Sequence, residues 1–250
     1  MAVSIKSARE IELMREAGKR LAHVHQELEA MIAPGISTWE IDAEGEKLIR
    51  DCGCIPNFLH YNGYPASICV SVNDEVVHGI PRKDRYLKEG DIVSLDAGLI
   101  YKGYHSDAAR THAVGKVSTE AQKLMDVTKQ SFFEGIKMAK EGQHLHDISR
   151  AIEEYVTPYG YGIVRDLVGH GIGTALHEDP QIPNYAQKRR GVRLQAGMTL
   201  AIEPMINAGT WQVRFLRDGW TVVTKDGSLS AHYENTILVT DGEPEILTLY

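Results

Sequence analysis

Two stretches near the start of the chain have apolar residues at the spacing of amphipathic helices, with charged residues between them. The first series is Ile11, Met14, Gly18, Leu21, Leu28 and Met31. A capping box between Ser7 and Glu10 begins it, and Pro34 ends it. A second capping box, between Ser37 and Glu40, begins a shorter series that ends at Gly53. The chain therefore opens with two predicted helices.

The rest of the chain combines two more helices with short strands. One helix begins near Ser118 and is broken at Glu141-Gly142, and another runs from about His144 to Pro158. Runs of β-branched and apolar residues bounded by turn residues predict strands at residues 67–72, 91–95, 111–114, 199–204, 220–223 and 232–239. A hairpin turn is predicted at Lys102-Gly103, between two tyrosines.

The predicted hairpin brings Asp96 and Asp107 opposite or nearly opposite each other. Like charges in such positions destabilise a strand pair. A shared proton, a basic partner or a metal would compensate. Taken alone, the pair also fits two carboxylates at an exposed sheet edge.

An internal repeat adds weight to these acidic positions. Residues 31–53 align without gaps on residues 138–160, and the same offset places Gly90 on Gly197 and Asp96 on Glu203. The place of Asp107 is then taken by Glu234. We expect one domain over residues 1–250 with two similar halves, about 1–115 and 116–250, each presenting a carboxylate from the end of an equivalent strand.

Composition narrows the class of protein. The chain has 250 residues, of which 43% are hydrophobic and 24% charged, as in ordinary globular proteins. A formal net charge of −7 gives no reason to expect specific nucleic-acid binding. The three cysteines cannot all pair, no apolar run is long enough to span a membrane, and the start of the chain does not resemble a signal peptide. We therefore expect a cytoplasmic protein with no membrane partner.

Four carboxylates and one imidazole form the candidate chemistry. They belong to Asp96, Asp107, Glu203, Glu234 and His170. Four carboxylates cannot all stay ionised together without cations, so we expect two divalent metals with bridging carboxylates. An oxygen-rich set with one imidazole suits manganese, iron, cobalt or zinc. Each acid alone would fit a turn or the surface. We expect the glycines around His170 to let the backbone approach a ligand and adopt conformations that other residues avoid.

These motifs together resemble those of type I methionine aminopeptidases, over nearly the whole chain. The motifs are Leu95-Asp96-Ala97-Gly98 with Ser106-Asp107, Gly169-His170-Gly171-Ile172-Gly173, Glu203-Pro204 and Glu234-Asn235-Thr236. The resemblance implies an α+β "pita-bread" fold, in which two pseudo-symmetric α/β halves surround a curved antiparallel sheet. It also implies that Asp96 binds one metal, that His170 and Glu203 bind the other, and that Asp107 and Glu234 bridge them.

The resemblance also implies the reaction, which removes the N-terminal methionine from nascent proteins and peptides and prefers a small second residue. A hydroxide activated by both metals attacks the first peptide bond, and Glu203 accepts a proton. His78 corresponds to the histidine that contacts the scissile amide nitrogen. His177 corresponds to the one that stabilises the oxyanion. Without the resemblance, both would be ordinary loop histidines.

A methionine pocket is implied at further positions. Tyr61, Tyr64, Cys69 and Trp220 match pocket positions of the family, although core packing would also explain them. Phe58 and Leu176 stand at the pocket rim, where some members carry cysteine and phenylalanine. Asn73, Glu75 and Ser230 lie where members can hold a monovalent cation, sodium or potassium.

Three alternatives remain. A prolidase or X-Pro aminopeptidase of the same fold would share the five metal residues, but the first predicted helix leaves no room before it for the N-terminal domain that such enzymes usually carry. A non-catalytic pita-bread binding module would have lost metal residues. A non-enzymatic metal-binding protein would leave His78, His177 and the pocket without a role.

The expected partner is the methionine at the start of a nascent polypeptide, and the protein is expected to be a monomer. Arg82, Lys83, Arg85 and Lys88 form a basic cluster. It fits a solvated loop, or a surface for transient ribosome contact.

Overall fold

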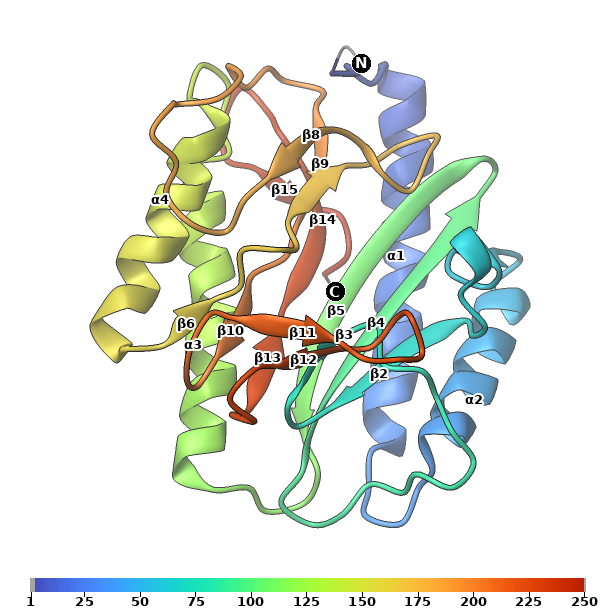
Figure 1. The fold of residues 1–250 in the computed structure, drawn as a ribbon. Helices are drawn as coiled ribbons and strands as arrows, with labels where there is room; N and C mark the ends of the chain where they lie inside the picture. Colours follow the sequence, from blue (N-terminus) through green and yellow to red (C-terminus); the bar gives the residue numbers. More distant parts are fainter. Residues whose placement is uncertain (1–2, 250) are drawn as a thin grey trace.

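Four helices are arranged in two pairs in the computed structural model, which describes residues 3–249. The first pair is α1 (Ala8–Met31) and α2 (Thr38–Asp51), and the second is α3 (Thr119–Ile136) and α4 (Leu145–Val156). Figure 1 shows the two pairs on opposite sides of the molecule with the strands between them. Both predicted capping boxes are present, at Ser7 with Glu10 and at Ser37 with Glu40. No helix within residues 3–249 has the length and apolar character needed to cross a membrane.

The strands form one large antiparallel sheet and two small ones. The large sheet has the order β1-β4-β5-β14-β9-β7-β8, with β2 paired to β4 and β15 paired to β14. Its strands are β1 (Ile55–Pro56), β2 (Ile68–Val72), β4 (Ile92–Tyr101), β5 (Tyr104–Ala113), β7 (Gly169–Gly171), β8 (Glu178–Ile182), β9 (Thr199–Ile202), β14 (Glu234–Leu238) and β15 (Glu245–Ile246).

The small sheets have the orders β13-β10-β6 and β11-β12-β3. Their strands are β3 (Glu75–Val77), β6 (Gly162–Ile163), β10 (Met205–Asn207), β11 (Val213–Phe215), β12 (Val222–Thr224) and β13 (Ser230–His232). Two short 3₁₀ turns, η1 (Tyr61–Gly63) and η2 (Thr157–Tyr159), complete the elements.

The two halves meet where β5 pairs with β14, at the centre of the large sheet. β4 flanks β5 on one side, and β9 flanks β14 on the other. Each half has its own apolar core. α1 and α2 bury Leu21 and Ile41 against the first half, whereas α3 and α4 bury Phe132 and Ile148 against the second. The predicted fold class is therefore confirmed, while the residue bounds of the halves stay a prediction.

The predicted central hairpin is present. Tyr101 pairs with Tyr104, and the two turn residues between them have positive φ angles, 48° at Lys102 and 85° at Gly103. Positive φ at both positions is typical of a type I′ turn, which matches the twist of the flanking strands. Asp96 pairs with Ala109, and Asp107 pairs with Gly98. The two aspartates are therefore offset by two positions, which makes them diagonal neighbours.

One predicted helix ends earlier than the sequence pattern indicates, and one predicted strand is interrupted. α3 ends at Ile136 and not at Glu141, because Lys140 pairs with Thr240 and draws the chain out of the helix. The predicted strand 232–239 is broken at Tyr233, whose amide donates to the carbonyl of Pro204. At this break the chain passes from a small sheet into the large one.

The expectation that the glycines beside His170 adopt conformations that other residues avoid is wrong for Gly169 and Gly171, while their approach to a ligand stays a prediction. Neither Gly169 nor Gly171 has a positive φ. Both are needed because neighbouring strands approach closely: a Cβ would lie 2.4 Å from the carbonyl oxygen of Ala201 at Gly169, and 2.2 Å from that of Asp179 at Gly171. These glycines therefore allow β7 to pack between β8 and β9.

We expect Gly171→Ala to lower the free energy of unfolding of the metal-free protein by about 1–3 kcal/mol, because the added methyl group forces β8 away from β7. Urea denaturation measures the change. Gly242→Ala is a suitable control, because its Cβ would meet no atom closer than 3.9 Å. An equal loss of stability in the two variants would contradict this explanation.

Candidate active site

Five adjacent strands of the large sheet each bring one candidate metal residue to the same place. In sheet order, β4, β5, β14, β9 and β7 position Asp96, Asp107, Glu234, Glu203 and His170. Four of these residues lie within their strands, and Glu203 directly follows β9. All five line one cavity of about 260 Å³.

The distances between these side chains suit a shared cation. Asp107, His170 and Glu234 each offer a ligand atom, and these atoms lie within 4.8 Å of one another. Nε2 of His170 is 3.7 Å from Oε1 of Glu203 and 4.0 Å from Oδ2 of Asp107. These groups are close enough to bind one ion but too far apart to satisfy one another by hydrogen bonds.

His170 presents a lone pair to this cluster. Its Nδ1 lies 2.8 Å from the carbonyl oxygen of Gly171, which can only accept a hydrogen bond. Nδ1 therefore carries the proton, and Nε2 of the neutral ring is left as an acceptor. Burial favours this state, because it lowers the pKa of His170 to about 4. An imidazole fixed in this way is the usual form of a metal-binding histidine.

The four carboxyl groups have raised pKa values in the absence of a cation. Burial raises the pKa of Asp96 to about 7. Burial, followed by the charges of the neighbouring carboxylates, raises the pKa values of Asp107, Glu203 and Glu234 well above their ordinary range.

Within the described part of the chain, three carboxyl oxygens of this cluster are buried without a hydrogen-bond partner: Oδ1 of Asp96, Oδ1 of Asp107 and Oε1 of Glu234. Unpaired buried acceptors are costly, and divalent cations would satisfy both the oxygens and the charge. The residues present therefore fit divalent metal ions.

Two further histidines stand beside the cluster. The ring of His177 lies 4.3 Å from that of His170, centroid to centroid, and its Nδ1 is 2.8 Å from the hydroxyl of Tyr61. His78 directly follows β3 and has a φ of 58°, a left-handed conformation that is uncommon outside glycine. Burial lowers the pKa values of both histidines, to about 4 for His78, so both are neutral near pH 7.

The other wall of the cavity is apolar. Phe58, Tyr64, Cys69 and Leu176 are buried in one cluster, and Trp220 packs against it. The ring of Trp220 meets that of Tyr64 edge to face at 5.2 Å, and the Tyr64 hydroxyl donates to the carbonyl of Gly79 at 2.9 Å. The buried polar end of Tyr64 is thus satisfied, and the exposed faces form an apolar recess beside the carboxylates.

The structure brings the predicted metal, histidine and pocket residues into this one cavity. The predicted monovalent-cation positions Asn73, Glu75 and Ser230 do not line it. Sequence reasoning missed Asn62, which also lines it, and His232, which lies behind it. Asn62 directly follows the predicted pocket residue Tyr61, and this position could have indicated that Asn62 also lines the cavity. No local signal distinguished His232, since its placement depends on the strand break at Tyr233.

A carboxylate and imidazole centre on the central strands of this fold defines a class of metallopeptidases. The model of metallopeptidase family M24 matches residues 12–241. A methionine aminopeptidase from Clostridium acetobutylicum is 54% identical to this chain over 99% of both proteins. The solved structure of a methionine aminopeptidase from Thermotoga maritima superposes with a TM-score of 0.97, at 46% identity and with all of both chains covered.

The chain therefore belongs to metallopeptidase family M24 and, within it, to the methionine aminopeptidases. The predicted family is confirmed. A prolidase from Pyrococcus furiosus shares the fold at a TM-score of 0.75 but only 23% identity, and this chain covers 65% of it. That more distant likeness shows the architecture alone.

We expect the metal-free protein to lose stability as the pH rises from about 4 to about 7. The pKa of Asp96 is raised from 3.8 to about 7, so the folded state holds a proton that the unfolded state releases over this range. The stability is therefore present below the unfolded pKa and lost as the pH rises through the folded one. Differential scanning calorimetry of chelator-treated protein measures this, and a flat profile would contradict it.

At pH 8, Asp107→Asn should raise the Tm of the metal-free protein by roughly 2–4 °C, equivalent to ~1 kcal/mol, because it removes a buried like charge. Divalent metal should reverse the order, with the wild type gaining more. The exposed Asp51→Asn serves as the control and should change neither result. A lower Tm of metal-free Asp107→Asn would count against charge repulsion.

Proposed function

We propose that this protein removes the N-terminal methionine from nascent proteins and peptides whose second residue is small. One observation carries the proposal: a single cavity joins the carboxylate and imidazole cluster to a closed apolar recess. The carboxylate and imidazole cluster, with its metal ions, would activate water and hold the amino end of a peptide. The apolar recess fits an unbranched apolar side chain. The 54% identity to a methionine aminopeptidase over nearly full length supports the same reaction.

The cluster divides into residues that would hold two divalent ions, cobalt, manganese, iron or zinc. We assign Asp96 to one ion, His170 and Glu203 to the other, and Asp107 and Glu234 to both. When bound, the ions would supply Lewis acidity and lower the pKa of a bound water.

Glu203 serves as the proton acceptor in this proposal. It keeps some exposure to the cavity, whereas Asp107 and Glu234 are 5% and 2% exposed. In the metal-free protein its pKa is raised by burial and by the charges of Asp107 and Asp96. Its backbone is fixed, because the side-chain amide of Asn184 donates to its carbonyl at 3.0 Å.

His177 and His78 act on the substrate as neutral imidazoles. If the Tyr61 hydroxyl donates to Nδ1 of His177, Nε2 of the neutral ring carries the proton and can donate to the developing oxyanion. His78 is assigned to the scissile amide nitrogen. Its left-handed backbone is supported by Gly79, where a Cβ would lie 2.3 Å from the carbonyl oxygen of Val70.

The apolar recess accounts for the choice of methionine. Phe58, Cys69 and Leu176 are each less than 10% exposed, so the recess is closed by well-packed side chains. Tyr61, Tyr64 and Trp220 supply aromatic surfaces, which make favourable contacts with a thioether sulfur. A branched leucine side chain has a different shape and lacks this sulfur contact.

We expect metal-dependent release of methionine from Met-Ala-Ser and little or no cleavage of Leu-Ala-Ser or Ala-Pro-Ser. The protein is stripped of metal and reloaded with manganese, cobalt, iron or zinc in turn, and free amino acids are quantified. Glu203→Gln should lower kcat by about 10²–10⁴-fold, because the proton acceptor is lost. Its far-UV circular dichroism should match that of the wild type.

The rival functions give different results in the same assay. Cleavage before proline alone would assign an X-Pro aminopeptidase or a prolidase-type enzyme. Binding of two ions without cleavage of any peptide would assign a non-catalytic module.

A monovalent cation is proposed near Asn73 and Ser230, where the amide of Ser230 donates to the carbonyl of Asn73 at 2.9 Å. The carboxylate of Glu75 is already paired with Arg85 at 2.7 Å and accepts from the amide of Val72. Glu75 would therefore contribute its backbone carbonyl rather than its side chain. We further propose that the protein is a cytoplasmic monomer.

Transient ribosome contact is proposed for the basic loop of Arg82, Lys83, Arg85 and Lys88. Arg82 pairs with Asp84 and Arg85 with Glu75, each at 2.7 Å, whereas Lys83 lies over the ring of Trp39 at 4.5 Å. The two lysines, which are not neutralised by a carboxylate in the described residues, are the better candidates. We expect Lys83→Glu with Lys88→Glu to reduce co-sedimentation with ribosomes several-fold at low salt, since contacts with phosphate are electrostatic. Tripeptide hydrolysis should be unchanged, and unaltered co-sedimentation would remove this surface from consideration.

A further inference from the structure

A sixth ionisable residue, His232, lies against the carboxylate cluster. It is the last residue of β13, and its side chain is 2% exposed. Its Nε2 is 3.9 Å from Oε2 of Glu203 and 3.9 Å from Oε2 of Glu234. Neither Nδ1 nor Nε2 has a hydrogen-bond partner in the part of the chain that the structure describes. A buried polar group in this condition is rare and calls for an explanation.

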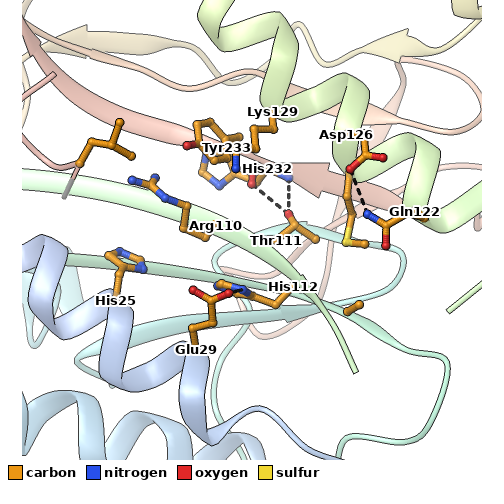
Figure 2. A pocket seen from close by; sticks show the side chains of 13 residues that line it. His25, Glu29, Arg110, Thr111, His112, Gln122, Asp126, Lys129, His232 and Tyr233 are labelled. Carbon is orange, nitrogen blue, oxygen red and sulfur yellow. Dashed lines mark hydrogen bonds and ion pairs between the residues drawn. The ribbon is translucent and has the colours of Figure 1, made fainter. Parts of the chain in front are cut away.

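The backbone of His232 is fixed from both directions. Figure 2 shows the side chain of Thr111, on β5, between the two backbone groups of His232. The Thr111 hydroxyl donates to the carbonyl at 2.9 Å and accepts from the amide at 2.8 Å. The position of the imidazole is therefore set by the sheet, and the ring can adjust only by turning about its side-chain bonds.

The ring lies behind the glutamates rather than among the cavity-lining residues. Among residues 3–249, His232 does not line the active-site cavity. It lines a separate cavity of about 370 Å³ together with His25, Arg110 and His112 (Figure 2). The two glutamate side chains thus stand between His232 and the space where substrate would enter.

The charge pattern selects one tautomer. A neutral imidazole has one N–H group and one lone pair. With the proton on Nδ1, the lone pair of Nε2 would face two carboxylate oxygens and be repelled by them. With the proton on Nε2, a donor faces two acceptors. A shift of about 1 Å in either carboxylate brings the 3.9 Å separation to hydrogen-bond length.

We propose that His232 is a positioning residue, whose Nε2–H donates to the carboxylates of Glu203 and Glu234 and holds them in the orientation that binds metal. The proposal rests on the metal site described under the proposed function. Carboxylates that bind metals are themselves oriented by such hydrogen bonds, and loss of the donor costs about 10–100-fold in metal affinity.

Titration of the metal-stripped protein with Co²⁺, by calorimetry and by visible absorption, tests the proposal without any peptide substrate. His232→Leu removes the donor, and we expect its affinity for Co²⁺ to fall about 10–100-fold with a changed absorption spectrum. His232→Gln keeps an N–H donor at a similar reach, and we expect its affinity to stay within about 3-fold of the wild type.

A fold defect would give a different pattern. The metal-free His232→Leu protein should have a Tm no lower than that of the wild type, because at 3.9 Å from both glutamates the ring makes no hydrogen bond that leucine would remove. His112→Leu is the matched control, since this histidine lines the same rear cavity and also has an unpartnered Nε2. It should leave Co²⁺ affinity unchanged.

Two outcomes would overturn the proposal. If His232→Leu binds Co²⁺ as tightly as the wild type, the residue does not position the glutamates. If His232→Gln loses as much affinity as His232→Leu, the role is not that of a donor. If Co²⁺ affinity follows the expected order while no variant cleaves methionyl peptides, the proposed function fails and the role of His232 stands.

Discussion

The repulsion among four carboxylates on the central strands is the constraint on which the site depends. The pairing order β4-β5-β14-β9 brings Asp96, Asp107, Glu234 and Glu203 together in space. Burial raises the pKa values of all four, and three of their oxygens have no hydrogen-bond partner among residues 3–249. A folded chain that tolerates this arrangement must obtain the compensation from outside, and divalent cations supply it.

Two separate apolar cores stabilise the fold against this repulsion. α1 and α2 pack against one half of the sheet, and α3 and α4 pack against the other. The carboxylate cluster therefore lies on strands that two separate apolar cores support. The close approach of β7 to β8 and β9 depends on glycines that have no side chain to exclude a neighbouring carbonyl. It is this approach that places His170 beside the carboxylates contributed by the other four strands.

The histidines of the site differ in how each ring is oriented. His170 is held through Nδ1 by the carbonyl of Gly171, and His177 is held through Nδ1 by the hydroxyl of Tyr61. In both rings Nδ1 has a hydrogen-bond partner, and Nε2 is left available. His232 is fixed by its backbone alone, and its ring faces two glutamates at equal distances. What holds the opposite ring nitrogen decides whether a neutral imidazole presents a lone pair or an N–H group to the cavity.

The sequence by itself determined the helices, the central hairpin and, through the family resemblance, most of the residues that line the cavity. Capping boxes, apolar spacing and turn residues are local, so they can be read without the fold, and the offset of 107 positions already matched Asp96 with Glu203. The tertiary structure decided what depends on contacts between distant segments. Pairing of Lys140 with Thr240 ended α3 early, and the break at Tyr233 set the position of His232. Such contacts leave no periodic trace in the chain, because each depends on which strands lie side by side.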